Sequence, residues 1–125
     1  MGTTSTIRQI IDRYLRAYEE RDFATCGAMF AEDAVFEDPV GGRRFDGIDQ
    51  IRVFLHGAPP EITIKADLHK VVECGSDAMF HYEMEITGWR ENPISIEVFE
   101  TIAIDEAGKI KSLRAFWNED SIVDR

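Results

Sequence analysis

The chain has 125 residues, which is the size of one domain and enough to bury roughly two thirds of its unfolded surface. Its composition, with 44% hydrophobic and 30% charged residues, is typical of a soluble globular protein. The net charge of −10 argues against nucleic acid and against an anionic membrane surface, because phosphate groups are bound by clustered Lys and Arg. We therefore expect a single domain over residues 1–125.

The chain carries no signal for a membrane span, a leader or a metal. No apolar run approaches the roughly 18 residues of a spanning helix, and the first residues lack a basic region followed by an apolar one. Cys26 and Cys74 show no motif spacing, so we expect a reduced, cytoplasmic setting. The histidines fall in no metal-ligand pattern, and His81 is expected on the outer, solvated face of a strand.

Three helices are predicted in the first half of the chain. Over residues 5–20 the apolar side chains recur at the three-and-four spacing of an amphipathic helix, which Thr4 or Ser5 can cap. A short second helix is predicted over about 22–30 and a third over about 48–56, each with apolar side chains turned inward.

Strands dominate the second half of the chain. A short strand at 34–38 is ended by Pro39. Alternating apolar residues then predict four longer strands, at 61–74, 78–87, 94–104 and 109–117, with a bulge near Val71-Val72 in the first of them. Helices followed by a run of antiparallel strands indicate an α+β fold, with the helices packed on one face of a curved sheet.

One predicted strand carries a carboxylate on its apolar face. At the two-residue period of a strand, Glu100 shares a face with five aliphatic residues: Ile94, Ile96, Val98, Ile102 and Ile104. An ionised carboxylate is costly in such a setting, so the group either finds a partner or keeps its proton with a raised pKa. A partner could be Arg114 on the next strand, but Leu113, Ala115 and Trp117 are the inward set there. We therefore predict an unpaired, protonated acid at a functional site.

Two further polar side chains lie on otherwise apolar surfaces. Tyr14 is on the inner stripe of the first helix, where it is either a core tyrosine or a hydrogen-bond donor directed into a cavity. Asp38 shares a strand face with Phe36 and either starts a turn or acts as an ionised general base at the rim of a pocket. With Glu100 these residues describe an apolar pocket with one base and two neutral donors. A base can remove a proton beside a carbonyl while neutral donors stabilise the developing oxyanion.

These residues resemble the ketosteroid isomerases of the nuclear transport factor 2-like superfamily. The resemblance runs from about residue 7 to 122, and its specific parts are Tyr14 and the Glu37-Asp38-Pro39-Val40-Gly41 segment. Tyr14 follows Arg13 in the first helix, and the other segments are shared more widely in the superfamily: Met29-Phe30-Ala31-Glu32-Asp33-Ala34, Ile51-Arg52-Val53-Phe54, Ala107-Gly108-Lys109 and Ser112-Leu113-Arg114-Ala115. A neutral carboxylic acid in the oxyanion hole of this enzyme is a known case.

The resemblance implies a cone-shaped α+β domain that isomerises a 3-oxo-Δ5-steroid through a dienolate. Asp38 would be the base, Tyr14 the first oxyanion donor, and Glu100 the second donor in the place of the family's protonated aspartate. The substrate cavity would be lined by Phe54, Leu55, Tyr82, Met84, Ile86, Leu113, Ala115 and Trp117. The resemblance also implies a small apolar substrate, no cofactor or metal, and a homodimer joined through the outer face of the sheet.

Two other interpretations remain open. Polyketide cyclases and epoxide hydrolases share the superfamily, although the epoxide hydrolases need an Asp-Arg-Asp arrangement and we expect no inward arginine. The third interpretation is a non-catalytic module that binds an apolar ligand or a protein.

Overall fold

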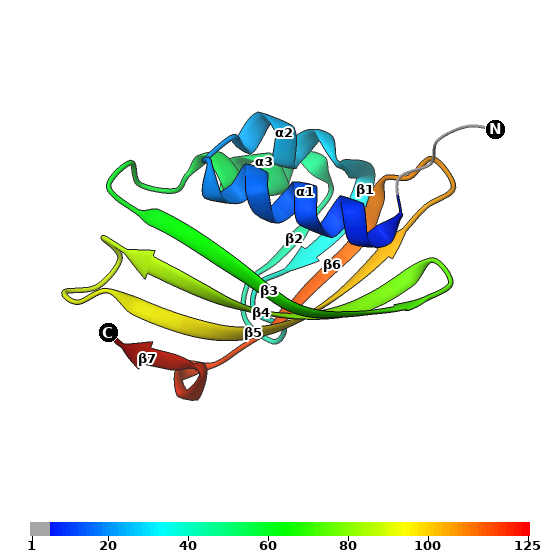
Figure 1. Cartoon of the computed structure of the whole chain (residues 1–125). Coiled ribbons are helices and arrows are strands. Elements are labelled where there is room, and N and C mark those ends of the chain that lie inside the picture. The colour runs from blue at the N-terminus through cyan, green and yellow to red at the C-terminus, as the bar shows by residue number, and fades with distance from the viewer. Residues whose placement is uncertain (1–5) are drawn as a thin grey trace.

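The computed structural model describes residues 6–125 as three helices on one face of a curved sheet (Figure 1). The helices are α1 (Ile7–Glu19), α2 (Phe23–Ala28) and α3 (Ile48–His56). The strands are β1 (Phe30–Glu37), β2 (Arg44–Asp46), β3 (Thr63–Cys74), β4 (Asp77–Thr87), β5 (Ile94–Ile104), β6 (Ile110–Phe116) and β7 (Ile122–Asp124). A short 3₁₀ turn, Glu119–Ser121, precedes β7.

The sheet is mostly antiparallel. Its strand order is β2-β1-β6-β5-β4-β3, and β7 pairs with β5 beyond this path. The pair β1–β6 is the parallel one, and it brings residues from the two ends of the chain side by side, such as Phe36 and Leu113. The predicted α+β fold, with helices packed on one face of a curved sheet, is confirmed.

Helix α1 begins with a capping box. The Thr6 hydroxyl accepts a hydrogen bond from the Gln9 backbone N–H, and the Gln9 side chain accepts one from the Thr6 N–H. The cap is therefore Thr6, while the predicted candidates Thr4 and Ser5 lie outside the described residues. Ile10, Ile11 and Leu15 are buried on the inner stripe, as the spacing predicts.

Several element bounds differ from the predicted ones. Helix α2 ends at Ala28, and β1 already starts at Phe30 because the Ile110 N–H donates to the Met29 carbonyl and draws this segment against β6. The irregularity of β3 lies between Leu68 and Lys70, earlier than the predicted bulge. Strands β2 and β7 were not predicted, because three residues are too few to show an alternation.

The two faces of the sheet have different characters. The predicted inward face of β5 is confirmed, since all six of its side chains, Glu100 included, are buried. On the outer face Met79, Phe99 and Phe116 are exposed. His81 lies there as expected but is only partly solvated, because its ring stacks on Phe99 at 4.4 Å and its Nε2 is 2.9 Å from a Glu97 oxygen.

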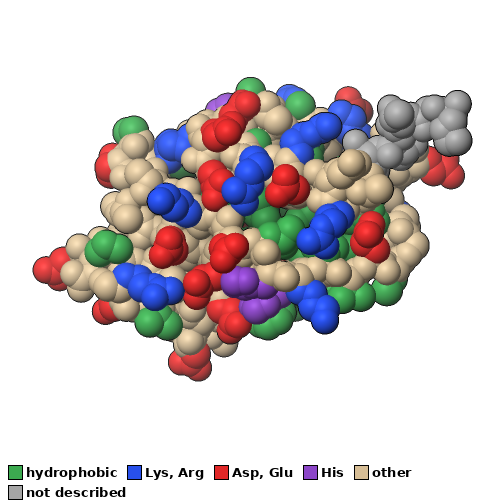
Figure 2. Space-filling model, in the orientation of Figure 1, with side chains coloured by type: hydrophobic (Ala, Val, Ile, Leu, Met, Phe, Trp, Pro, Cys, Tyr) green, Lys and Arg blue, Asp and Glu red, His purple; other side chains and the backbone are tan. Residues whose placement is uncertain are grey.

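Charged side chains of both signs cover the side of the molecule seen in Figure 2. They are interspersed over the helices and the edge of the sheet, so the net charge of −10 does not gather there into one acidic area. Among residues 6–125 no helix combines the length and the apolar character that a membrane crossing requires.

Candidate active site

A cavity of about 480 Å³ lies between the helices and the inner face of the sheet. Of the eight side chains expected to line the pocket, five do so: Phe54, Tyr82, Met84, Ile86 and Trp117. Tyr14, Asp38 and Glu100 line the same cavity, so the structure brings the three predicted chemical groups together in one compartment. The remaining wall is mainly apolar and includes Leu15, Phe36, Val53, Ile62, Ile64, Ile96 and Val98.

The prediction that Leu55, Leu113 and Ala115 line the cavity is wrong. All three face the interior, but they are buried in the hydrophobic core and are not among the residues that line the cavity. Leu113 is paired with Phe36 of β1 and Ile102 of β5, and all three belong to the hydrophobic core. An inward direction was therefore not sufficient to place a residue at the pocket.

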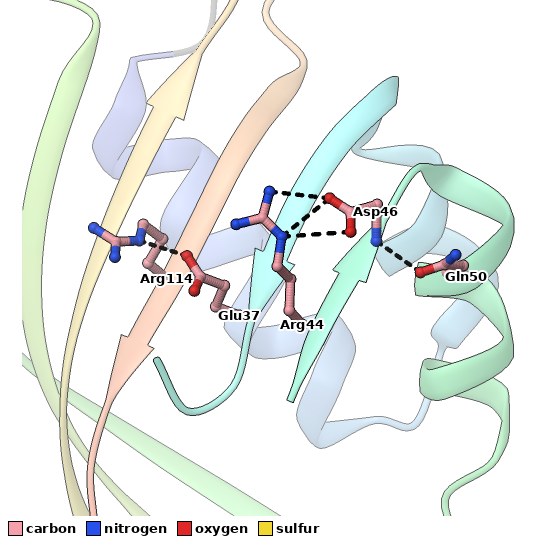
Figure 3. Close-up of polar contacts among 5 residues, drawn as sticks. All are labelled: Glu37, Arg44, Asp46, Gln50 and Arg114. Carbon is pink, nitrogen blue, oxygen red and sulfur yellow. Dashed lines mark hydrogen bonds and ion pairs between the residues drawn. The ribbon is translucent and has the colours of Figure 1, made fainter. Parts of the chain in front are cut away.

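Glu100 is buried in the cavity wall and has one hydrogen-bond partner. The Tyr82 hydroxyl donates to Oε1 of Glu100 at 2.8 Å. Burial, with a smaller effect from the Asp38 charge, raises the pKa of Glu100 to about 8, although the Tyr82 hydrogen bond acts in the opposite direction. The prediction that Glu100 has no cationic partner on the neighbouring strand is confirmed, while its hydrogen bond with Tyr82 was not predicted. Arg114 is not the partner, because its Nε donates to Glu37 Oε1 at 2.7 Å (Figure 3).

Asp38 follows β1 and lies at the wall of the cavity with its side chain 20% exposed. The indole Nε1–H of Trp117 donates to Oδ1 at 2.7 Å, which leaves Oδ2 for another partner. Burial raises the pKa of Asp38, while the Trp117 hydrogen bond and the Arg43 charge lower it. The carboxylate is therefore less solvated than the sequence suggested.

Tyr14 is buried, and its hydroxyl has no hydrogen-bond partner among residues 6–125. Burial, with smaller effects from neighbours that include Glu100 and Asp38, raises its pKa well above the usual value, so the hydroxyl keeps its proton. Leaving a buried hydroxyl unsatisfied costs about 1–3 kcal/mol, and such groups are rare in native proteins. A ligand oxygen in the cavity would satisfy this donor.

Comparison with known proteins assigns the family. Residues 11–113 match the SnoaL-like domain family. This chain belongs to that family. The match covers most of the described residues and agrees with the superfamily that the sequence motifs suggested.

Relatives of this SnoaL-like domain include enzymes of different kinds. The chain is 28% identical over 120 residues to a steroid Δ-isomerase of Nocardioides simplex, and the match covers 96% of each protein. The epoxide hydrolase/cyclase-like enzyme SalBIII, which acts in pyran ring formation in the polyether salinomycin, has a similar structure (TM-score 0.85, 23% identity, 94% of this chain and 95% of that one). So does the Δ5-3-ketosteroid isomerase of a Mycobacterium species (TM-score 0.81, 20% identity, 91% and 94%). An LEH-like epoxide hydrolase of M. tuberculosis follows at TM-score 0.77 and 19% identity, over 89% and 81% of the two chains.

Two polar residues of the SnoaL-like domain's cavity were missed from sequence. Arg43 lines the cavity, with its guanidinium Nη2 4.0 Å from Asp38 Oδ2, so the expectation of no inward arginine is wrong. Tyr18 lines it too, one turn after Tyr14 on α1, and this spacing was the available signal. Arg43 gave no signal, because it lies in a polar loop after a Gly-Gly turn.

The cavity of this SnoaL-like domain thus combines two carboxyl groups with tyrosine hydroxyls in a mainly apolar wall. Tyr14 and Tyr82 are protonated at neutral pH, and Glu100 is mainly so, since its pKa is about 8. Burial raises the pKa of Asp38 too, and among residues 6–125 its Oδ2 accepts no hydrogen bond. Among residues 6–125 no three His, Cys, Asp or Glu side chains come together in a way that could hold a metal. The groups present suit proton transfer between carbon or oxygen atoms.

Proposed function

We propose that this SnoaL-like domain is an isomerase that moves a proton between two carbons of a flat, apolar enone precursor such as a 3-oxo-Δ5-steroid. One observation carries the proposal: a base, Asp38, shares an apolar cavity with two protonated donors, Tyr14 and Glu100. The 28% identity to a steroid Δ-isomerase supports the same substrate class.

In this proposal Asp38 is the proton carrier. Its Oδ2 takes a proton from the carbon between the carbonyl and the double bond, and the C–H electron pair moves toward the carbonyl oxygen to form a dienolate. The same carboxyl then returns the proton to the far carbon of the dienolate, which leaves a conjugated enone and regenerates Asp38. Trp117, which donates to Oδ1, holds the carboxyl plane steady while Oδ2 moves the proton.

Tyr14 and Glu100 are proposed to stabilise the dienolate oxygen. The Tyr14 hydroxyl lacks a protein partner among the described residues, so the substrate oxygen is a natural acceptor for it. Glu100 accepts from Tyr82 at Oε1, which leaves Oε2 to carry the proton toward the substrate. Neutral donors suit this task because they do not repel the forming oxyanion, as a second ionised carboxylate would.

The size and chemistry of the cavity suit a multi-ring apolar ligand. Its volume of about 480 Å³ lies within the range of small-molecule pockets, and apolar side chains form most of its wall. Trp117 provides a flat surface against which fused rings can pack.

The test is to add a 3-oxo-Δ5-steroid and to follow the ultraviolet band of the conjugated product. We expect turnover above the buffer rate, and a loss of about 10²–10⁴-fold in kcat in Asp38→Asn, since general-base catalysis contributes about this much. Asp33→Asn is the matched control, because Asp33 is exposed on the same strand. No turnover by the parent protein, or equal rates in Asp38→Asn and the parent, would refute the proposal.

A fluorescent phenol that mimics the dienolate separates catalysis from simple ligand binding. We expect it to bind as the phenolate, with a clear loss of affinity in Tyr14→Phe, if the oxyanion donors act as proposed. Binding that ignores both Tyr14 and Asp38 would instead support a non-catalytic module.

Epoxide opening is the second candidate, and the Arg43–Asp38 pair favours it. In that reaction Asp38 takes a proton from water or a substrate hydroxyl, the oxygen attacks an epoxide carbon, and Glu100 gives its proton to the released oxygen. A hydroxy-epoxide and a simple epoxide offered beside the steroid discriminate the two functions by product analysis.

We further propose that two copies of the chain associate through the outer face of the sheet. Phe99 and Phe116 are neighbours across β5 and β6, and Met79 is exposed on β4 of the same face. Such adjacent apolar side chains on a sheet face are typical of an interface.

A further inference from the structure

Arg43 stands at the rim of the cavity in a fixed position. Its Nε donates to the Asp38 backbone carbonyl at 2.8 Å, and its guanidinium lies over the Phe54 ring, 4.9 Å from the ring centre. These two contacts come from two different elements, from the residue that follows β1 and from α3. The planar group is therefore already oriented before any ligand arrives.

The rest of the Arg43 fork has no hydrogen-bond partner within residues 6–125. Its Nη2 is 4.0 Å from Asp38 Oδ2, which is beyond hydrogen-bond distance, and its side chain is 54% exposed. Among the described residues that line the cavity, Arg43 is the only cation, while Asp38 and Glu100 are the acids. The rim thus offers several oriented N–H donors to an acceptor that lies partly outside the cavity.

The adjacent Arg44, by contrast, has an acidic partner for its guanidinium. Its side chain is 55% exposed, close to the value for Arg43, but its Nε and Nη2 both lie 3.1 Å from Asp46 Oδ1 (Figure 3). The Asp46 backbone N–H in turn donates to the side-chain oxygen of Gln50. Arg44 is thus occupied on the β2–α3 side and does not line the cavity.

We propose that Arg43 is a specificity-determining residue that binds a carboxylate at the outward end of the substrate's ring system. The inference rests on the proposed function for the placement of the ring system, whose ketone points inward to Tyr14 and Glu100. A carboxylate is the preferred partner because its two oxygens match the planar N–H fork of arginine. The substrate class would then be an acidic steroid or a similar polycyclic acid.

The electrostatics of the rim set the size of the effect. Asp38 opposes an anionic ligand, and the exposure of Arg43 lets water and salt screen the attraction. An exposed ion pair with good geometry contributes at most about 1 kcal/mol, so the carboxylate should improve affinity by about fivefold. The gain should shrink as salt is added.

The experiment measures binding of two ligands that cannot be isomerised further. They are a conjugated 3-oxo-steroid with a carboxylate on its outer ring and the methyl ester of the same acid. Dissociation constants are measured at pH 7 for the parent protein, Arg43→Gln and Arg44→Gln. We expect the parent and Arg44→Gln to prefer the acid by about fivefold, and Arg43→Gln to bind the two ligands equally.

Each outcome decides the proposal separately from the reaction. A preference for the acid that disappears only in Arg43→Gln supports it, even if no isomerisation is ever detected. Equal binding of acid and ester to the parent protein, no saturable binding of the acid, or an equal loss in Arg44→Gln would overturn it. A change in the turnover of Arg43→Gln with an unchanged preference for the acid would also overturn the proposal. Arg43 would then act on Asp38 and not on the ligand.

Discussion

Replacing Glu100 by glutamine tests whether a buried acid controls the pH dependence of folding. The pKa of Glu100 is about 8 in the folded protein, against an ordinary value of 4.5, because the side chain is buried. Between these two pH values the folded protein holds a proton that the unfolded chain has lost. Its contribution to stability is therefore fully present below pH 4.5 and is lost as pH rises toward about 8.

The expected magnitude follows from that interval. Each pH unit within it lowers the free energy of unfolding by about 1.4 kcal/mol, so the whole interval is worth about 5 kcal/mol. Such a loss is comparable to the total stability of many domains. Glutamine keeps the shape and can still accept the Tyr82 hydrogen bond, but it does not ionise. Tyr82 stays protonated over this range, because burial raises its pKa well above 10.

The assay is urea unfolding of the parent protein and Glu100→Gln at a series of pH values from about 5 to 9. We expect the stability difference between the two to widen in favour of Glu100→Gln by about 4 kcal/mol across this range. Glu106→Gln, a variant at an exposed turn residue, removes the same charge and should show a constant difference. A difference between parent and Glu100→Gln that does not change with pH would refute the reasoning about Glu100.

Three more predictions concern activity and assembly. The plot of kcat/KM against pH should be bell-shaped, because Asp38 must lose its proton on the acid side and Glu100 must keep its proton on the basic side. Activity should fall through about pH 8 as Glu100 ionises, and this fall should be absent in Glu100→Gln. In the parent protein the Tyr82 hydrogen bond lowers the Glu100 pKa, so Tyr82→Phe should move the fall in activity to higher pH and should cost about 1–3 kcal/mol in urea unfolding. An unchanged position of this fall on the pH axis would contradict the prediction. Phe99→Glu should turn a dimer into a monomer in sedimentation experiments while Glu97→Gln on the same face does not, and an unchanged dimer would exclude this interface.

The sequence predicted those features that depend on local periodicity. The alternation of side chains along β5 was enough to predict the burial of Glu100, and the apolar spacing of α1 correctly predicted that Tyr14 points inward. Its partner could not be predicted, because Tyr82 reaches Glu100 only through the pairing of β4 with β5. Periodicity states which way a side chain points, but not which other side chain occupies the space in front of it.

Arg43 and Leu113 show two ways in which periodicity fails to predict the cavity lining. Arg43 follows a turn, where no periodicity applies, and its place at the cavity depends on a backbone carbonyl and on Phe54. Leu113 points inward as its strand predicts, yet it is buried in the core and is not among the residues that line the cavity. Both positions are decided by packing between elements far apart in the chain, for which a single sequence has no local signal.

The parallel pairing of β1 with β6 also has a consequence for how Asp38 is oriented during folding. Asp38 follows β1, and the Trp117 indole that donates to it follows β6, 79 positions later in the chain. Contacts of such long sequence separation form slowly, because a long loop must close first. During synthesis β1 has no parallel neighbour until β6 has been made, while β3, β4 and β5 can already pair as consecutive hairpins. The carboxylate is therefore oriented only when folding is nearly complete, and partly folded chains should be inactive even where most of the sheet is in place.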